Sequence, residues 1–554
     1  MTATTRDHET ASGSNELFGA VDEISMQQIS GWARYPEGND VVRLDLQVNG
    51  EVVGGFEANE FRHDLTKMRE DGRFAFHVDL TKAIHPVLAP LSLRDCVPQD
   101  AEVLLVDAKS GAVIPGGSAT WAGTAPADQQ GLALPDGQRV ALLKGVIAIP
   151  ISARPPGWRA SLSAAAKSAI DAGAAAGIRL ALGYGSLLGA VRAGRMIDHD
   201  DDMDLILITR ANNVLDAVQE MKAAQSFFLN LGYKIIELSN GQFKLLPDSP
   251  DIELDVFLAW SEGDALALSF TVKSGPALQD VLPLIVMNFE GVSLPVPRRP
   301  ELLLAAIYGE SWEIPNPRFR WEVSQEVAEF FAPVHNYDRG AHGEYWNAFY
   351  ADPSAPSYPS QFAAFALSRL SPDTFVVDLG CGSGRDTEFF VRYGHDALGI
   401  DYSGPAVEFN TARAMEEDWG NRVQFNQFDM SNLTDVHAAL EQVDRLREGR
   451  PVLIYSRFFF HAVDDATEGG SLIFIREVLS RSVGEALIEF RTTEDEDRLK
   501  VHPNHYRRYV ATDDLVRRAA EIYGLDCAYR VEGLGYATFK TEDARVARLS
   551  LVRR

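Results

Sequence analysis

The chain has 554 residues, more than one hydrophobic core usually supports, so we expect three or four domains. Hydrophobic residues make up 46% and charged residues 24%, ordinary globular values that exclude a largely disordered chain. The formal net charge of −27 at pH 7 repels phosphate backbones and anionic membranes at long range, so nucleic acid is excluded as the main partner.

The cysteines and the first residues bear on the compartment. Cys96, Cys381 and Cys527 are widely spaced and odd in number, which fits neither a disulfide framework nor a zinc site and predicts a reducing compartment. The opening residues carry both charge signs and no apolar core, and no run of about 18 apolar residues occurs elsewhere, so we expect no signal peptide and no membrane span. The predicted location is the cytoplasm, with a peripheral membrane association left open.

The first part of the chain predicts a tail, a β-sandwich and a linker. Residues 1–14 are polar and small, as in a disordered tail. Residues 15–124 alternate apolar and polar positions in short runs, and Asn49-Gly50 favours a tight hairpin turn, which together predict the sandwich. Residues 125–139 are rich in Pro, Gly, Gln and Asp, the composition of an exposed linker.

Several segments of this first unit resemble a β-domain attached to bacterial glycosyltransferases. They are Phe18-Gly19-Ala-Val-Asp22, Ile29-Ser-Gly31-Trp32-Ala33 and Ala58-Asn59-Glu-Phe61-Arg62. The resemblance implies a binding or assembly module. Trp32 is either a sugar-stacking platform or a core aromatic side chain.

The central unit, predicted over residues 140–328, has an α+β pattern with an aspartate-rich string. In an extended strand residues i and i+2 face the same side, so Asp202 and Asp204 project together, with Asp200 as a further member. Asp255, inside the next strongly apolar strand, is the candidate third ligand. Hard carboxylates on one face form half of a magnesium site, and a solvated acidic loop is the alternative.

With Gly183-Tyr-Gly185-Ser186 upstream, this string resembles the LicD/fukutin family of phosphotransferases, whose fold belongs with the nucleotidyltransferases. The resemblance implies transfer of a phospho-alcohol from a CDP-activated donor to a sugar hydroxyl, with Mg²⁺ or Mn²⁺ stabilising the charges. Gly185 and Ser186 would begin a helix that receives phosphate, and Arg192 and Lys244 would neutralise it.

The last unit, predicted over residues 329–554, alternates short apolar strands with helical segments, the pattern of a parallel sheet. Its first strand runs from Asp378 into a glycine-rich turn, where glycine lets the backbone turn tightly and approach a ligand. The second strand ends in Asp401, which can accept both hydrogen bonds of a ribose diol, and Asp429 follows the third. The glycines of the turn are Gly380, Gly382 and Gly384.

These motifs resemble the class I methyltransferase family, which has a Rossmann-like fold, over roughly residues 335–554. The resemblance implies S-adenosylmethionine as cofactor. Asp378 and the three glycines would surround its methionine part, Asp401 would bind its ribose, and Asp429 would lie beside its adenine. The alternative is that the glycines form only a tight turn.

The acceptor side of this unit rests on fewer signals. Arg457 and His461 follow the fourth strand and should border the methyl group. His461 is a candidate general base, since histidine titrates near physiological pH, and a structural hydrogen bond is the alternative. Tyr506, Arg507 and Arg508 suit a phosphorylated or sugar-bearing acceptor, or form a solvated face. Aromatic segments before the first strand predict a lid or core packing.

Two motif sets on one chain predict a bifunctional enzyme of surface-glycan biosynthesis. It would add a phospho-substituent and a methyl group to the same acceptor. The expected partners are a glycan or glycolipid precursor and a CDP-linked donor, and contact with the inner membrane would run through other glycan-assembly enzymes. The alternative is a methyltransferase whose other units only bind glycan. The oligomeric state is left open.

Overall fold

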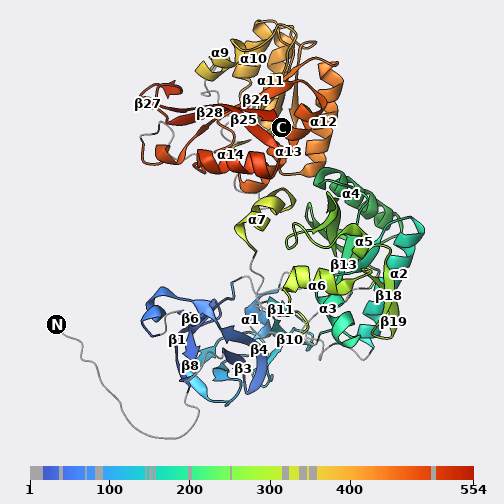
Figure 1. Cartoon of the computed structure of the whole chain (residues 1–554). Coiled ribbons are helices and arrows are strands. Elements are labelled where there is room, and N and C mark those ends of the chain that lie inside the picture. Colours follow the sequence, from blue (N-terminus) through green and yellow to red (C-terminus); the bar gives the residue numbers. More distant parts are fainter. Residues whose placement is uncertain are drawn as a thin grey trace, which may run out of the picture.

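The computed structural model describes residues 17–36, 41–68, 72–81, 91–143, 146–148, 154, 157–197, 202–249, 252–314, 323–335, 346–347, 358–498, 500 and 507–554. Figure 1 shows a strand-rich N-terminal unit, a mixed central unit and a C-terminal unit built on a large sheet. Within these ranges, no helix combines the length and the apolar character needed to cross a membrane.

The N-terminal unit is a β-sandwich. One sheet has the order β1-β2-β6-β5 and the other the order β11-β10-β4-β3-β7-β8, with β9 paired to β10. Ile29 from the first sheet and Leu44 from the second enter one shared core, as expected for sheets with one buried face. The elements are β1 (Phe18–Ile24), β2 (Gln28–Arg34), β3 (Val42–Val48), β4 (Glu51–Ala58), β5 (Glu60–Phe61), η1 (His63–Lys67), β6 (Arg73–Asp79), α1 (Leu93–Cys96), β7 (Ala101–Asp107), β8 (Val113–Trp121), β9 (Leu132–Ala133), β10 (Arg139–Leu143) and β11 (Val146–Ala148).

The second sheet continues beyond residue 124, through a segment whose composition favoured a linker. β10 runs parallel to β4, with Leu142 opposite Gly54. A side chain at Gly54 would come within 2.9 Å of Leu142 Cβ, so glycine is needed for this close approach. The polar residues that resemble a linker form the turns between short strands, while a few apolar side chains enter the core.

Two motifs of the N-terminal unit have structural partners. Arg62 forms two hydrogen bonds with Asp64, at 2.8 and 3.0 Å, and a third with Asp22. Trp32 is half-buried and packs edge-on against Phe74, with 5.8 Å between the ring centroids. This packing is that of the core-aromatic alternative for Trp32.

The central unit is an α+β fold around a sheet of order β12-β13-β16-β15-β14, with β17 paired to β16. β13 and β16 are parallel, in a register that places Asp204 opposite Asp255. The elements are α2 (Trp158–Ala175), β12 (Leu180–Leu182), α3 (Tyr184–Ala193), β13 (Met203–Ile208), α4 (Val214–Asn230), β14 (Lys234–Ser239), β15 (Gln242–Leu246), β16 (Leu254–Glu262), β17 (Ala265–Leu268), α5 (Leu278–Val281), β18 (Ile285–Phe289), β19 (Val292–Val296) and α6 (Pro300–Tyr308).

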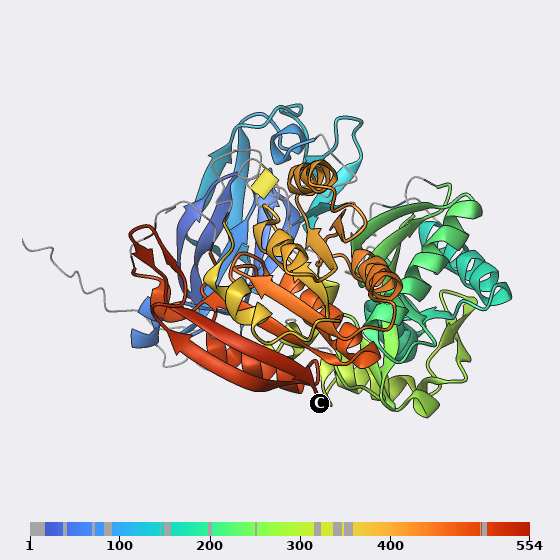
Figure 2. The ribbon, with the colours of Figure 1, turned by 90° about the horizontal axis from the view of Figure 1, so that it is seen from above.

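The C-terminal unit has a sheet of order β22-β21-β20-β23-β24-β28-β25, in which β22 to β24 are parallel and β28 is antiparallel to both neighbours. The red strands β25 and β28 form one edge of it (Figure 2). Its elements are α9 (Gln361–Leu367), β20 (Phe375–Leu379), α10 (Arg385–Arg392), β21 (Ala397–Asp401), α11 (Gly404–Glu416), β22 (Val423–Gln427), α12 (Leu433–Arg447), β23 (Val452–Arg457), α13 (Asp465–Arg481), β24 (Gly484–Arg491), η5 (Thr493–Asp495), α14 (Thr512–Glu521), β25 (Leu525–Gly533), β26 (Thr538–Phe539), β27 (Glu542–Asp543) and β28 (Val546–Arg553).

The central and C-terminal units share one continuous hydrophobic core. Between them lie α7 (Gln325–Phe331) and the short helix η4 (Ala332–Val334), and α4 packs against α12 (Figure 1). Lys273 of the central unit pairs with Glu326 of α7 at 2.6 Å, and Arg517 of the C-terminal unit pairs with Glu329 at 2.8 Å. The interface is therefore partly a core and partly an ion-pair rim.

Candidate functional sites

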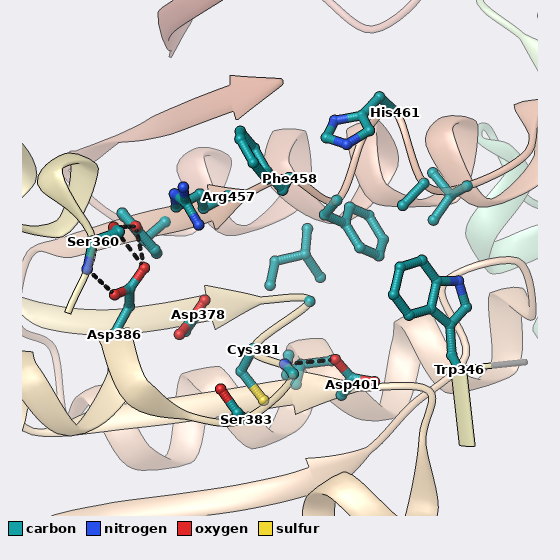
Figure 3. Close-up of a pocket in the computed structure, with 18 of the residues that line it drawn as sticks. Trp346, Ser360, Asp378, Cys381, Ser383, Asp386, Asp401, Arg457, Phe458 and His461 are labelled. Carbon is teal, nitrogen blue, oxygen red and sulfur yellow. Dashed lines mark hydrogen bonds between the residues drawn. The ribbon is translucent and has the colours of Figure 1, made fainter. Parts of the chain in front are cut away.

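A cavity of about 530 Å³ opens at the carboxyl ends of β20 to β23. The strand order reverses between β20 and β23, and ligands of open α/β sheets bind at such a point. Figure 3 shows Asp378 and Asp401 on one side of the cavity and Phe458 and His461 on the other, with Trp346 at one end. The predicted cofactor residues that line the cavity are Asp378, Gly380, Gly382, Asp401 and Asp429.

The turn after β20 requires its glycines. Gly380, Gly382 and Gly384 have φ angles of +77°, +51° and +69°, a region that other residues rarely adopt. A Cβ at Gly380 would lie 2.5 Å from the ring of Phe459, and one at Gly384 would lie 2.8 Å from Asn410. Gly384 is the N-cap of α10 rather than part of the cavity wall. The turn thus brings bare backbone to the cavity.

Asp401 is held by backbone donors at the end of β21. Its Oδ2 accepts a hydrogen bond from Gly382 N at 2.8 Å, and its Oδ1 accepts one from Ser403 N at 2.9 Å. Burial raises the pKa of Asp401, and these backbone N–H groups oppose the rise. Each carboxylate oxygen has a second lone pair, so the group can still accept from a diol in the cavity.

Asp429 lies in the loop after β22 and lines the cavity. Its Oδ1 accepts hydrogen bonds from Ser431 N at 2.9 Å and from Ser431 Oγ at 2.6 Å. Asp429 N in turn donates to Asp435 Oδ2 at 2.9 Å. These contacts give the loop one conformation beside the predicted adenine position.

Beside Asp378 lies a buried network of polar side chains that the sequence analysis did not predict. Asp386 accepts hydrogen bonds from Ser360 N, Ser360 Oγ and Tyr455 Oη at 2.7, 2.8 and 2.7 Å (Figure 3). Asp378 itself accepts one from Thr387 Oγ1 at 2.6 Å, and burial raises its pKa to about 8. Ser360 begins α9, so the network ties the segment before β20 to the cavity wall.

Arg457 reaches the cavity from a buried ion-pair triad. Glu489 lies between Arg457 Nε at 3.0 Å and Arg548 Nε at 2.7 Å. Burial raises the pKa of Glu489, and the two guanidinium groups oppose the rise. The Arg457 guanidinium also lies over the ring of Phe458, 4.1 Å from its centroid. Phe458 has a φ of +59°, a strained conformation that these neighbours hold.

We expect Glu489→Ala to lower the free energy of unfolding by about 3–5 kcal/mol, because it leaves two buried guanidinium groups without their shared carboxylate. Denaturant unfolding would measure the loss. Asp526→Ala is the control: Asp526 pairs with Arg554 at 2.9 Å on the surface, where a pair contributes roughly 0–1 kcal/mol. Equal, small losses in both variants would contradict a structural role for the triad.

His461 lies in the cavity wall with a defined tautomer. Its Nδ1 accepts a hydrogen bond from Arg491 N at 3.2 Å, so in the neutral ring the proton is on Nε2. In this state Nε2 is a donor, whereas a base acting through Nε2 needs a lone pair there. In the neutral ring this tautomer makes His461 Nε2 a donor rather than a base, and the catalytic role of His461 stays a prediction.

The neighbouring arginines of the predicted acceptor segment separate in the structure. Arg507 lines the cavity. Arg508 instead forms ion pairs with Glu468 and Asp465 of α13, and burial lowers the pKa of Arg508 to about 10. Tyr506 lies outside the described residues.

The central unit brings four of its predicted residues together. Asp204 Oδ2 accepts a hydrogen bond from Gly185 N at 2.9 Å, and Asp204 N donates to Ser186 Oγ at 3.0 Å. Both partners lie in the first turn of α3. Opposite Asp204, Asp255 Oδ2 accepts from Gln242 Nε2 at 3.1 Å. The start of α3 and the two carboxylates thus form one small acidic site.

Lys244 balances part of this acidity. Its Nζ lies 3.4 Å from Asp255 Oδ1 and forms an ion pair with Glu253. Burial raises the pKa of Asp255, which Lys244 opposes. Asp255 Oδ1 is buried and accepts no hydrogen bond from the described residues.

The other predicted residues of the central unit do not all join the acidic site, and one of them lies outside the described residues. Arg192, near the other end of α3, donates to Trp312 O rather than to the acidic site. Asp202 is partly buried next to β13, and Asp200 lies outside the described residues. In the part of the chain that the structure describes, no group of three or more His, Cys, Asp or Glu side chains is arranged to hold a metal ion.

The sheet of the C-terminal unit, with its cavity where the strand order reverses, is a Rossmann-like fold. Family models match two regions of the chain. Residues 177–299 match the model described as LicD/FKTN/FKRP, nucleotidyltransferase domain. Residues 376–446 match the model described as a methyltransferase domain. The chain is thus an enzyme that combines a LicD-type domain with a methyltransferase domain, which confirms the predicted fold class and these two resemblances. Neither match covers the N-terminal unit, so its resemblance to a β-domain of glycosyltransferases stays a prediction. No protein of curated function matches the chain.

Solved methyltransferase structures are similar to the C-terminal unit. An S-adenosylmethionine-dependent methyltransferase from Anabaena variabilis is 16% identical over 40% of this chain and 96% of its own, with a TM-score of 0.29. The CcbJ methyltransferase from Streptomyces caelestis is 16% identical over 39% and 99%, with a TM-score of 0.29. The glycopeptide N-methyltransferase MtfA, solved with S-adenosyl-L-homocysteine, is 17% identical over 40% and 100%, with a TM-score of 0.28. At these values the acceptors of those enzymes say nothing about the acceptor of this chain.

Proposed function

We propose that the chain is a bifunctional cytoplasmic enzyme of surface-glycan biosynthesis. The central unit transfers a phospho-alcohol from a CDP-activated donor to a sugar, and the C-terminal unit methylates the same acceptor with S-adenosylmethionine. The observation that carries the proposal is that one chain holds both constellations: Asp204 opposite Asp255 at the start of α3, and Asp401 at the glycine-rich turn.

In the C-terminal unit the chain's own residues bind and orient the cofactor. Asp401 would accept from the ribose, Asp429 would lie beside the adenine, and Asp378 with the turn after β20 would hold the methionine part. The cofactor supplies an activated methyl group. Phe458 and Phe459 line the cavity and would exclude water from the transferred group. Arg457 and Arg507 border the acceptor side, where guanidinium groups suit a phosphate-bearing acceptor.

The raised pKa of Asp378 predicts proton release when the cofactor binds. With a pKa of about 8, Asp378 is mostly protonated at pH 7 in the free enzyme. The positive charges of the methionine part favour the carboxylate and lower its pKa, so binding at pH 7 should release up to about one proton. Affinity should therefore rise with pH and level off above about pH 8.

Titration calorimetry at pH 7, in two buffers with different heats of ionisation, measures this release. Asp378→Asn, which has the same shape and no titration, is the matched control and should show no buffer dependence. A buffer-independent heat in the unmodified enzyme would contradict the assignment of Asp378 to the cationic end of the cofactor.

A divalent cation fits the acidic site of the central unit. Asp204 and Asp255 are neighbours in register on the parallel strands β13 and β16, and both carboxylates belong to one acidic site. Asp255 Oδ1 is buried, and its charged neighbour is the Lys244 ammonium at 3.4 Å. Mg²⁺ or Mn²⁺ would be held by Asp202, Asp204 and Asp255, with Asp200 as the predicted further ligand. The ion would neutralise charge on the transferred phosphate. Lys244 adds a positive charge beside Asp255, while Gly185 and Ser186 hold the start of α3 against Asp204.

A second candidate function rests on Lys244. Lys244 forms ion pairs with Asp255 and Glu253 and so compensates their charge without a metal ion. A unit that binds glycan and has no catalytic metal would be stabilised in this way. In that case the chain is a methyltransferase whose other units bind glycan. A labelling experiment distinguishes the two: the bifunctional enzyme transfers phosphorus from a CDP-activated donor labelled at its β-phosphate to an oligosaccharide, and the binding module transfers none.

The order of the two reactions is open to a direct test. We propose that phosphotransfer comes first, because Arg457 and Arg507 at the cavity suit an acceptor that already carries phosphate. Purified enzyme is offered an unmodified oligosaccharide with S-adenosylmethionine alone. Efficient methylation without any CDP donor would overturn this order.

A further inference from the structure

One buried side chain of the central unit reaches the loop after β22 of the C-terminal unit, the loop that carries Asp429 and Ser431. Asn240 lies in the turn between β14 and β15 and is 1% exposed. Its Nδ2 donates to Ser431 O at 2.7 Å and to Pro333 O at 2.9 Å. Both amide N–H bonds are therefore used, one on the loop after β22 and one on η4.

Ser431 transmits this contact to the cavity. The carbonyl of Ser431 faces Asn240, while its N and Oγ hold Asp429 Oδ1 at 2.9 and 2.6 Å. Ser431 lines the cavity together with Asp429. The Ser431 carbonyl and the Ser431 N–H belong to adjacent planar peptide units joined at one Cα, so fixing Ser431 O restricts where Ser431 N, and with it Asp429, can lie.

The loop is also packed on its other side, against α13. Met430, the preceding residue, packs against α13 so closely that a Cβ at Gly470 would lie 1.8 Å from Met430 O. The loop is thus confined between α13 of its own unit and the β14–β15 turn of the central unit. Of these two supports, only the second comes from another domain.

We infer that Asn240 is a positioning residue for the adenine end of the cofactor site, so that cofactor affinity depends on the central unit. The inference rests on the proposed binding of S-adenosylmethionine. Without the Asn240 amide, two buried carbonyl oxygens lose their donor, and the loop must move to find another. Asn240 does not touch the methyl group, so the chemical step itself does not depend on it.

The decisive variant is Asn240→Asp, which keeps the shape but has one donor when protonated and none when ionised, so at least one of Ser431 O and Pro333 O loses its hydrogen bond. We expect its Kd for S-adenosylmethionine to rise about 3- to 30-fold, the scale of a lost buried hydrogen bond that couples two sites. Adenosine alone should weaken by a similar factor. The kcat at saturating cofactor should stay within about twofold, a split that general unfolding would not produce.

Lys273→Ala is the matched control. It removes the ion pair with Glu326 at the same interface without reaching the loop, and it should leave the Kd unchanged. If Asn240→Asp does not fold, as judged by circular dichroism, Asn240→Ala replaces it, with an expected rise of about threefold or more. Combining Asn240→Ala with Ser431→Ala should give non-additive losses, because both act on Asp429.

The outcomes separate the two claims. Absence of cofactor binding to the unmodified enzyme would overturn the proposed function. Normal binding with an unchanged Kd in both Asn240 variants, or an equal loss in Lys273→Ala, would overturn the positioning role and leave the proposed function standing.

Discussion

Asp401→Ala is expected to weaken the binding of S-adenosylmethionine by roughly 1.5–3 kcal/mol, about 10- to 150-fold in Kd. The carboxylate is the one group at the end of β21 that can accept from both ribose hydroxyls, and Gly382 N and Ser403 N already hold it in place. Its removal deletes these charge-assisted hydrogen bonds and releases the glycine-rich turn. Titration calorimetry measures the change.

Two controls keep the Asp401 result specific. Asp401→Asn retains the shape and one oxygen acceptor, so its loss should be smaller than that of alanine. Asp396→Ala removes a carboxylate near the other end of β21, paired with Arg422 and Arg450, and should leave cofactor affinity unchanged. Wild-type affinity in Asp401→Ala would refute the assignment of this residue to the ribose.

Asp204→Asn is expected to reduce phosphotransfer by at least about 100-fold while methyl transfer to a pre-phosphorylated acceptor continues. Replacing partners of metal ligands alone commonly reduces activity 10- to 100-fold, and Asp204 is proposed as a direct ligand. The amide keeps the shape and one acceptor oxygen for Gly185 N, so α3 should stay in place. Product analysis by mass spectrometry separates the two activities.

The control for Asp204 is Asp171→Asn, on the exposed face of α2, where Asp171 pairs with Lys167. It should leave both activities unchanged. Excess chelator should abolish phosphotransfer in the unmodified enzyme. Full phosphotransfer by Asp204→Asn, or in chelator, would rule out the proposed metal site.

The sequence predicted the parts of the sites that local patterns encode. The glycine-rich turn and Asp401 each lie at the end of an apolar strand, and parallel strands bring such ends to one edge. Asp204 and Asp255 were paired in the same way, from two apolar strands. In both cases a short motif is sufficient to predict the site, because the sheet brings the ends of its parallel strands together.

Other parts depend on contacts between distant segments. The network of Asp386, Ser360 and Tyr455 forms only when α9 packs beside α10 and β23. The spacing of these residues in the sequence does not predict it. Arg507 and Arg508 are adjacent and chemically identical, yet Arg507 lines the cavity while Arg508 pairs with Glu468 of α13. A single sequence gives no basis for choosing between them.

The same limit applies to larger elements. The segment around β9 and β10 has the composition of a linker, and it becomes part of a sheet because Gly54 of β4 leaves room for Leu142. Asn240 is an ordinary turn residue in the sequence. Its contact with Ser431 exists only because the central and C-terminal units share a core.

The most direct test of the account is a pair of calorimetric titrations on the purified full chain, one with S-adenosylmethionine and one with CDP plus Mg²⁺. A bifunctional enzyme predicts saturable binding of each ligand with one site per chain, lost separately in Asp401→Ala and in Asp204→Asn. Binding of S-adenosylmethionine alone, with no heat from CDP at any Mg²⁺ concentration, would contradict the claim that both units are catalytic.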